Sequence, residues 1–190
     1  LEAYQLRREL SALRQRAGAF DRIVGDSPAA HQLQQLIARV APVNSRVLIT
    51  GAPGTGKELA ARCIHEASSR AEGPFVVINS ATITPENMEI ELFGREGADG
   101  ERKIGALEEA HGGTLFLDEI ADMPKDTQAK ILRVLVDQTF QRVGGSNKVE
   151  VDVRIISSSA RDLASAIEEG TLREDLFHRL AVVPIRIPSL

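Results

Sequence analysis

Apolar and polar residues follow two patterns along this chain. Short runs rich in β-branched and apolar residues alternate with segments whose apolar positions recur every three or four residues, which is the pattern of βα units around a parallel sheet. The runs predict five strands, at Arg46–Thr50, Phe75–Asn79, Thr114–Asp118, Val151–Ser157 and Val182–Ile187. The longer segments predict helices at His31–Val40, Lys57–Ser68, Pro85–Leu92, Thr127–Asp137 and in the Asp162–Leu180 region. The sequence therefore predicts an α/β fold with a parallel five-stranded sheet flanked by helices.

Two further segments refine this organisation. Residues 1–19 read as a linker helix, in which apolar residues from Ala3 to Ala17 recur at heptad spacings. This helix is interpreted either as a dimerising coiled coil or as an amphipathic helix docked on its own domain. Residues 20–190 would form the α/β unit. Within it, the GGSN stretch at Gly144–Asn147 predicts a turn that closes a hairpin before the fourth strand.

Composition narrows the classes of function. The 190 residues suffice for one sizeable core. A net charge of −4 argues against DNA binding by this segment itself, because phosphate binding requires a concentrated basic face. The single cysteine, Cys63, excludes an internal disulfide and is expected to be buried. No apolar run approaches the roughly 20 residues that span a bilayer, so we expect a cytoplasmic protein without membrane contact. The abrupt ends predict a piece of a longer protein.

The strongest chemical signal is the stretch VLITGAPGTGKE at Val47–Glu58. A strand, a glycine-rich loop and a helix follow one another there, as the phosphate-binding P-loop requires. Backbone amides would converge on a phosphate at the helix N-terminus, and Lys57 would reach its terminal groups. Glu58 departs from the general motif, which has Ser or Thr to hold Mg²⁺. The residues expected to bind the nucleotide here are Gly51, Ala52, Pro53, Gly54, Thr55, Gly56, Lys57, Glu58 and Leu59.

The second signal is an acidic pair at the end of the third predicted strand. In GGTLFLDEI, Gly112–Ile120, an apolar run leads directly into Asp118 and Glu119. Ligands of open α/β sheets bind at the carboxyl ends of the strands, so this pair is expected beside the P-loop. Asp118 would hold Mg²⁺, usually through water, and Glu119 would position or deprotonate the attacking water.

Together these residues resemble the AAA+ class of P-loop ATPases, and collinear blocks narrow the likeness to one family. The blocks at Glu91–Gly94, Gly112–Ile120, Ile131–Leu135, Arg142–Gly145, Val151–Ile156 and Arg173–Leu180 resemble the central domain of sigma-54-dependent, NtrC-type response regulators. That family has GKE in its P-loop, which accounts for Glu58. Its fold would be an AAA+ domain that binds ATP or ADP with Mg²⁺, and the segment 1–19 is similar to the linker after a receiver domain.

The resemblance implies roles for further residues. Asn79 matches the residue that switches the catalytic glutamate on or off, and Ser159 occupies the sensor I position, followed by Ala160 where the family usually has Asn or His. Arg173 and Arg179 match arginines that reach into the neighbouring subunit's site, which implies a self-oligomer. The stretch lining the adenine pocket corresponds to Val24 and Gly25.

Two departures from the family pattern shape the functional expectation. The family's GAFTGA loop, which contacts sigma-54, is replaced by a shorter polar stretch at Gly97–Gly100. Activation of sigma-54 polymerase is therefore not expected, as in NtrX-type members. The helical lid, and the helix-turn-helix module through which the family binds DNA, would lie outside these residues. Two hypotheses remain open: an oligomeric ATPase with arginine fingers in trans, or a nucleotide-dependent oligomerisation switch with little turnover.

Overall fold

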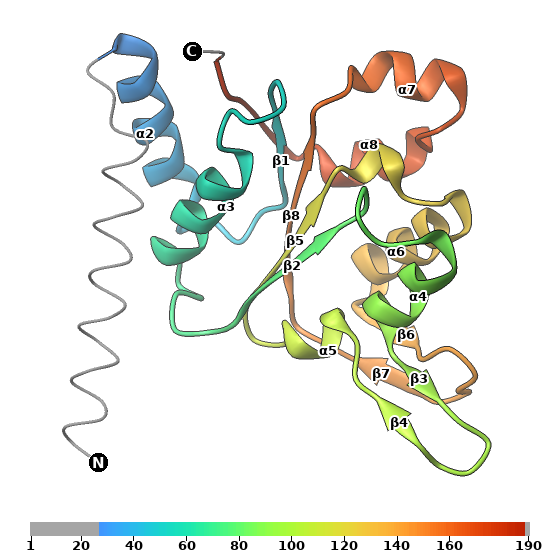
Figure 1. Ribbon diagram of the computed structural model, residues 1–190. Helices are drawn as coiled ribbons and strands as arrows, with labels where there is room; N and C mark the ends of the chain where they lie inside the picture. The colour runs from blue at the N-terminus through green and yellow to red at the C-terminus, as the bar shows by residue number, and fades with distance from the viewer. Residues whose placement is uncertain (1–26, 189–190) are drawn as a thin grey trace, which may run out of the picture.

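A computed structural model describes residues 27–188 of the protein. Its centre is a five-stranded, wholly parallel sheet with strand order β2-β5-β8-β1-β9, and helices cover both faces (Figure 1). The strands are β1 (Val47–Thr50), β2 (Phe75–Asn79), β5 (Thr114–Asp118), β8 (Arg154–Ser159) and β9 (Val183–Arg186). The predicted α/β architecture is confirmed. The linker helix 1–19, Val24 and Gly25 lie outside the described residues.

Strands buried on both faces explain the apolar runs in the sequence. In β5, Leu115 and Leu117 enter one core cluster while Phe116 enters the other. In β1, Leu48 belongs to the first cluster and its neighbour Ile49 to the second. Such strands cannot alternate between apolar and polar residues, because neither side of a parallel sheet faces water.

The helices divide between the two faces. Helices α2 (Pro28–Val40) and α3 (Lys57–Glu66) pack on one side of the sheet, as Figure 1 shows. The other side carries α4 (Pro85–Phe93), α5 (Ala106–Glu109), α6 (Lys125–Asp137), α7 (Leu163–Glu169), α8 (Glu174–Leu180) and the short 3-10 helix η1 (Ile120–Asp122). None of the helices in residues 27–188 combines the length and the apolar character that a bilayer crossing requires.

A buried arginine joins α2 to the sheet. Arg154, at the start of β8, is 3% exposed and donates to the carbonyl oxygens of Val40, Ala41 and Ser45 at 2.8–3.0 Å. The Val40 and Ala41 carbonyls lie at the C-terminal end of α2, where a cation compensates the helix dipole. Burial lowers the pKa of Arg154 to about 10, so the side chain remains charged at neutral pH. The helix that borders one side of the site is thus fixed to a central strand.

Several boundaries differ from the sequence-based expectation. β8 runs over Arg154–Ser159 instead of Val151–Ser157, because Val151 and Val153 belong to the connection from β7 (Lys148–Glu150). β7 pairs with β6 (Thr139–Gln141), which confirms the expected hairpin around Gly144–Asn147. The Asp162–Leu180 region is two helices, since α7 ends before Gly170, whose φ of 80° is left-handed.

One unpredicted element is a small antiparallel hairpin of β3 (Arg95–Glu96) and β4 (Arg102–Lys103). It projects from the lower end of the domain in Figure 1. Two-residue strands leave no alternating pattern long enough to recognise in a sequence, so only its polar turn was visible there.

Candidate functional site

The loop between β1 and α3 has the form of an anion-binding site. α3 begins at Lys57 with Gly56 as its N-cap, and no side chain caps its first amides. Gly56 has φ 88°, a left-handed conformation that glycine adopts without strain. A Cβ on Gly51 would lie 2.8 Å from the Thr55 hydroxyl and 3.2 Å from the Ile187 carbonyl oxygen. Glycine at these two positions therefore lets the loop turn tightly and leaves helix amides free for a phosphate.

The side chain of Lys57, the first residue of α3, bonds to this loop. Its side chain is 7% exposed, and its ammonium group donates to the carbonyl oxygens of Gly51 and Ala52, each at 3.0 Å. Ala52, Pro53 and Gly54 at the tip are exposed. The loop thus holds a positive charge under a solvent-accessible rim, which is the arrangement that attracts a polyanion.

The two residues after Lys57 have different surroundings. Glu58 is exposed on the first turn of α3, and Leu59 packs against the core cluster beneath that helix. No described contact joins either side chain to the loop, so their assignment to the nucleotide stays a prediction.

The acidic pair lies at the same edge of the sheet. Asp118 ends β5, and Glu119 follows with φ 58°, an uncommon conformation for a residue other than glycine. Asp118 accepts a hydrogen bond from the Ser158 hydroxyl, which in turn accepts from the Glu119 amide at 3.3 Å. The Glu119 carboxylate accepts from the Ala160 amide at 3.2 Å. The end of β8 therefore fixes both acidic residues.

Asn79 and Ser159 lie close to this pair but make other bonds. Asn79 is beside Asp118 in the register of β2 and β5, and its side-chain oxygen accepts from the Ala81 amide at 3.0 Å. Within residues 27–188 no hydrogen bond joins Asn79 to Glu119. The Ser159 hydroxyl donates to the Arg161 carbonyl and accepts from the Arg161 amide, both at 3.1 Å. The proposed switch and sensor residues are thus adjacent to the catalytic candidates, and their roles stay predictions.

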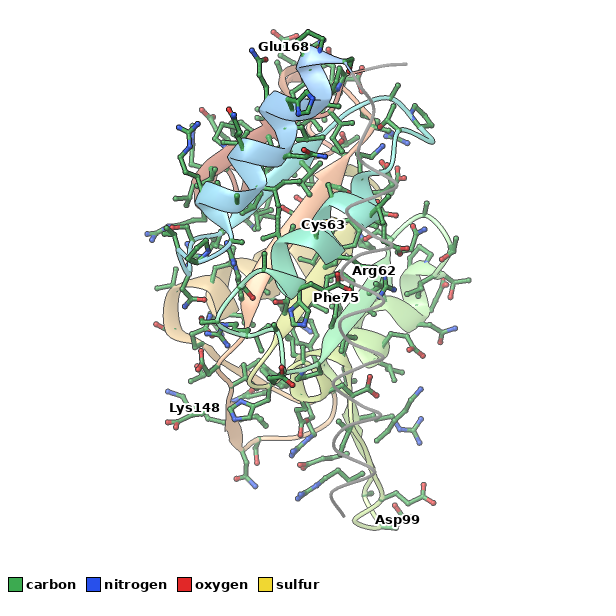
Figure 2. All side chains as sticks on the ribbon, turned by 90° about the vertical axis from the view of Figure 1, so that its left-hand side faces the viewer. Arg62, Cys63, Phe75, Asp99, Lys148 and Glu168 are labelled. Carbon is green, nitrogen blue, oxygen red and sulfur yellow. The ribbon has the colours of Figure 1, made fainter. Side chains whose placement is uncertain are left out.

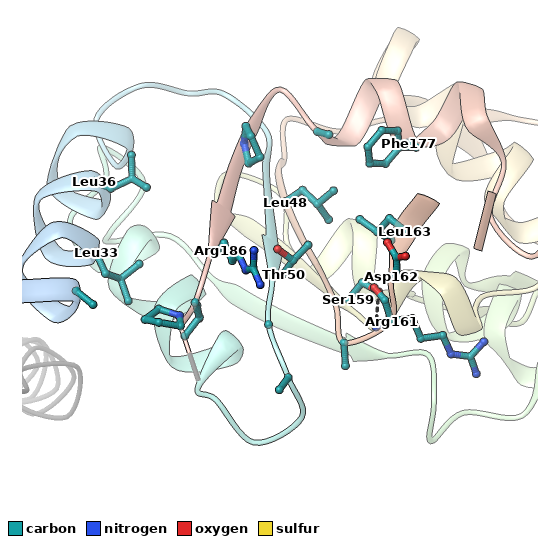
Figure 3. A pocket seen from close by; sticks show the side chains of 18 of the residues that line it. Leu33, Leu36, Leu48, Thr50, Ser159, Arg161, Asp162, Leu163, Phe177 and Arg186 are labelled. Atoms are coloured by element: carbon teal, nitrogen blue, oxygen red, sulfur yellow. Dashed lines mark hydrogen bonds between the residues drawn. The ribbon is translucent and has the colours of Figure 1, made fainter. Parts of the chain in front are cut away.

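A hollow of about 1060 Å³ opens beside the loop. Figure 3 shows Leu33 and Leu36 of α2 on one side of it, Thr50 and Arg186 at the strand ends, and Ser159 bonded to Arg161 opposite. Sequence reasoning did not place Leu33, Leu36, Leu163, Phe177 or Arg186 here. These residues belong to apolar stripes and strand ends whose pattern reports burial, and only the fold brings them to one hollow.

These residues fit a nucleotide and its divalent cation. Free helix amides and Lys57 suit the phosphates, while the apolar side chains of α2 suit a flat base. Among the described residues, no group of three or more His, Cys, Asp or Glu side chains could hold a metal ion alone. Mg²⁺ is usually held by one or two carboxylates together with substrate phosphates. Asp118, at the same sheet edge as the loop, would provide the carboxylate.

The two candidate finger arginines lie elsewhere. Arg173, at the start of α8, forms two bonds to Asp175 at 3.0 and 2.9 Å. This pairing raises the pKa of Arg173 and lowers that of Asp175. Arg179 is exposed, and neither arginine lines the hollow beside the loop. Within one subunit, the structure does not bring them to Lys57.

The polar stretch Gly97–Gly100 forms the tip of the β3–β4 hairpin. Asp99 marks its far end in Figure 2, and Ala98, Asp99 and Gly100 are exposed. The base of the hairpin is fixed by Arg142, which bonds Glu96 at 2.6 Å and Glu108 at 2.7 Å. The segment Arg142–Gly145, noted only as a sequence block, therefore holds this hairpin against the domain.

Comparison with known proteins agrees with this geometry. Residues 23–186 match the sigma-54 interaction domain family. The chain is 61% identical, over its full length, to the nitrogen assimilation regulatory protein NtrX of Azorhizobium caulinodans, of which it covers 42%. It is 48% identical over 88% of its length to the DNA-binding transcriptional regulator NtrC of Escherichia coli, of which it covers 37%.

A solved structure of NtrX from Brucella abortus in complex with ATP is similar over the whole chain, with 65% identity and a TM-score of 0.87, and the chain covers 43% of it. A corresponding ADP complex has the same similarity. The chain thus spans less than half the length of these relatives.

Proposed function

Since this chain belongs to the sigma-54 interaction domain family, we propose that it is the ATP-binding AAA+ domain of a two-component transcriptional regulator and hydrolyses ATP in an oligomer. The observation that carries this proposal is that the loop holding Lys57 and the acidic pair, Asp118 and Glu119, follow parallel strands at the same edge of the sheet, with β8 between them. ATP and ADP complexes of the similar NtrX support the choice of nucleotide.

Each part of the site has a distinct task in this proposal. The loop Gly51–Gly56 and Lys57 bind the phosphates, and Asp118 holds Mg²⁺ beside them. Bound Mg²⁺ would neutralise charge on the phosphates during transfer. Glu119 orients the attacking water and accepts its proton at the carboxylate, after exchanging the Ala160 amide for that water. Ser159 and Asn79 adjust this step from the neighbouring strands.

In this proposal a second copy adds a guanidinium to the charge that Lys57 already places at the terminal phosphate. Arg173 and Arg179 lie outside the hollow of their own subunit, which is consistent with the proposed action on a neighbour. Arginine fingers contribute about 10³ to 10⁵ in rate in other phosphoryl-transfer systems. The isolated subunit is therefore expected to be a poor catalyst.

A second candidate function is a nucleotide-dependent oligomerisation switch with little turnover. It is favoured by the bond from the Ala160 amide to Glu119 and by the absence of a polar side chain at position 160. In this arrangement the Glu119 carboxylate accepts from the Ala160 amide, and the Asn79 side-chain oxygen accepts from the Ala81 amide. Nucleotide would then change subunit association without being consumed.

Contact with sigma-54 is not part of either proposal. The hairpin tip at Gly97–Gly100 is polar and has no apolar residue larger than Ala98 to dock on a partner. The net charge of −4 argues against DNA contact by this segment. In the proposed regulator, a helix-turn-helix module elsewhere in the protein binds DNA, and a receiver domain receives the input signal. The expected compartment is the cytoplasm.

The test is steady-state ATP hydrolysis as a function of protein concentration, with Glu119→Gln as control. A specific activity that rises with concentration and vanishes in the control supports the oligomeric ATPase. Nucleotide binding without turnover at any concentration supports the switch. Open-complex formation by sigma-54 polymerase, driven by this protein and ATP, would contradict the proposed loss of sigma-54 contact.

A further inference from the structure

Three consecutive serines end β8, and they make different bonds. Ser157, Ser158 and Ser159 are all fully buried. The Ser157 hydroxyl has no hydrogen-bond partner among the described residues, and the Ser159 hydroxyl bonds only to the backbone of Arg161. Only the middle hydroxyl reaches the acidic pair. The three positions therefore allow the role of one hydroxyl to be separated from the general effect of a buried serine.

The Ser158 hydroxyl links both acidic residues to the neighbouring strand. It donates its proton to Asp118 Oδ1 and accepts from the Glu119 amide at 3.3 Å. A hydroxyl has one hydrogen and two lone pairs, so both bonds form at the same time. Because β5 and β8 are adjacent strands, a single atom joins the metal-ligand candidate, the backbone of the catalytic candidate and the sheet.

This linkage has two chemical consequences. The hydroxyl occupies one oxygen of Asp118, which restrains the carboxylate and leaves Oδ2 outside this bond. It also supports the left-handed backbone of Glu119, whose φ of 58° is unfavourable unless surrounding bonds hold it. Partners that orient a ligating carboxylate typically change metal affinity 10- to 100-fold when they are removed.

We propose that Ser158 is a positioning residue for divalent-cation binding, acting by orienting Asp118 and the Glu119 backbone. The inference rests on the proposed function, in which Asp118 holds Mg²⁺ beside the nucleotide. Ser158 touches neither phosphate nor water in this assignment. Its removal changes the cation step and leaves cation-free nucleotide binding intact.

The experiment compares Ser158→Ala with Ser157→Ala, which removes an equally buried hydroxyl without a partner. Binding of fluorescent ADP is first measured in EDTA, and Mn²⁺ affinity of the ADP complex is then measured by electron paramagnetic resonance. Ser158→Ala is expected to keep wild-type ADP affinity in EDTA and to bind Mn²⁺ about 10-fold more weakly. Ser157→Ala is expected to match wild type in both, and Ser158→Thr, which keeps the hydroxyl, to restore Mn²⁺ affinity.

The outcomes separate this inference from the proposed function. Wild-type Mn²⁺ affinity in Ser158→Ala, or an equal loss in Ser157→Ala, overturns the role of Ser158. If the wild-type chain does not bind ADP, the proposed nucleotide site is overturned. If Asp118→Asn binds Mn²⁺ with wild-type affinity, the proposed metal site is overturned. If Ser158→Ala does not fold, Ser158→Cys replaces it, because a thiol of similar size donates only weakly.

Discussion

The carboxyl edge of the sheet and helix α8 hold their charged residues in opposite ways. At the sheet edge, Lys57 is buried with two carbonyl bonds, and Asp118 and Glu119 are bonded to Ser158 and Ala160. At the start of α8, the Arg173 and Asp175 side chains are 39% and 48% exposed and form an ion pair, and the Asp175 carboxylate also accepts from the Leu176 amide.

This difference separates two kinds of catalytic candidate. Groups that act within their own subunit are placed by strand register and by bonds between neighbouring strands. Groups proposed to act on a neighbour must stay accessible, so the subunit leaves them at its surface. The candidate arginines consequently look like ordinary surface residues in one copy, and the following variants test whether that appearance is misleading.

The largest expected effect is on turnover in Arg179→Ala. ATP hydrolysis should fall by about 10³, because the Arg179 guanidinium would no longer stabilise charge on the transferred phosphoryl group. ADP affinity should stay at the wild-type value, since Arg179 does not line the hollow. Turnover is measured by phosphate release. The matched control is Arg133→Ala, because Arg133 is also an exposed arginine but lies on α6 instead of α8.

Mixing two inactive variants sharpens this test. Arg179→Ala keeps an intact phosphate loop, and Lys57→Ala keeps its arginines, so mixed oligomers regain turnover if the arginine acts in trans. If Arg179→Ala alone shows wild-type turnover, Arg179 is not catalytic, and the contrast between the sheet edge and α8 does not separate two kinds of catalytic group.

Lys57→Ala should weaken nucleotide binding by about 100-fold, because it removes a buried cation that is expected to pair with phosphate. Titration of fluorescent ADP measures this change. Arg62→Ala provides the control, since Arg62 is an exposed cation on the same helix. Unchanged affinity in Lys57→Ala would show that the loop does not bind the phosphates.

Arg154→Met should lower the free energy of unfolding by about 2 kcal/mol, since it leaves carbonyls at the end of α2 without their charged donor. Denaturant unfolding followed by circular dichroism measures the change. Arg179→Ala should leave the unfolding midpoint unchanged, so that a buried arginine affects folding and an exposed one affects only catalysis. Equal destabilisation by both would contradict that division.

The smallest expected effect is in Asp175→Ala. Removing the partner that holds Arg173 within its own subunit should raise turnover by at most about fivefold, because exposed ion pairs are weak. Phosphate release again provides the measurement, and Glu174→Ala, an exposed neighbour, is the control. Reduced turnover would instead indicate that Asp175 positions Arg173 for its task.

Local sequence patterns predicted most of the elements near the site. The strand at Thr114–Asp118 was predicted at both of its observed boundaries, and the helix after the loop at its start, Lys57, although it ends at Glu66 and not at Ser68. The apolar run and the glycine loop are both continuous in the chain. The hollow beside the loop was not predicted. Leu33, Phe177 and Arg186 come from three elements, and nothing in their local surroundings distinguishes a residue lining a hollow from one in the core.

The hydrogen-bond partners of the site residues could not be predicted from the sequence either. The likeness to the family pairs Asn79 with Glu119, whereas Asn79 bonds Ala81 and Glu119 bonds Ala160. Which of two nearby partners a side chain bonds depends on the distance and angle between donor and acceptor, and the folded structure sets both. The bridging role of Ser158 was missed for the same reason, since three identical serines in a row carry no signal that singles out the middle one.

The strand order has a consequence for the order of assembly during synthesis. β1, which leads into the phosphate loop, has no partner among the strands near it in sequence: Val47 lies beside Ile156 of β8 and Val183 of β9. During synthesis, β1 and the loop leave the ribosome before β8 and β9 do. β1 therefore cannot pair until the chain up to those strands has been translated. Such distant pairings slow folding. A nucleotide bound as proposed would stabilise the folded domain and not a chain whose last strands are still missing.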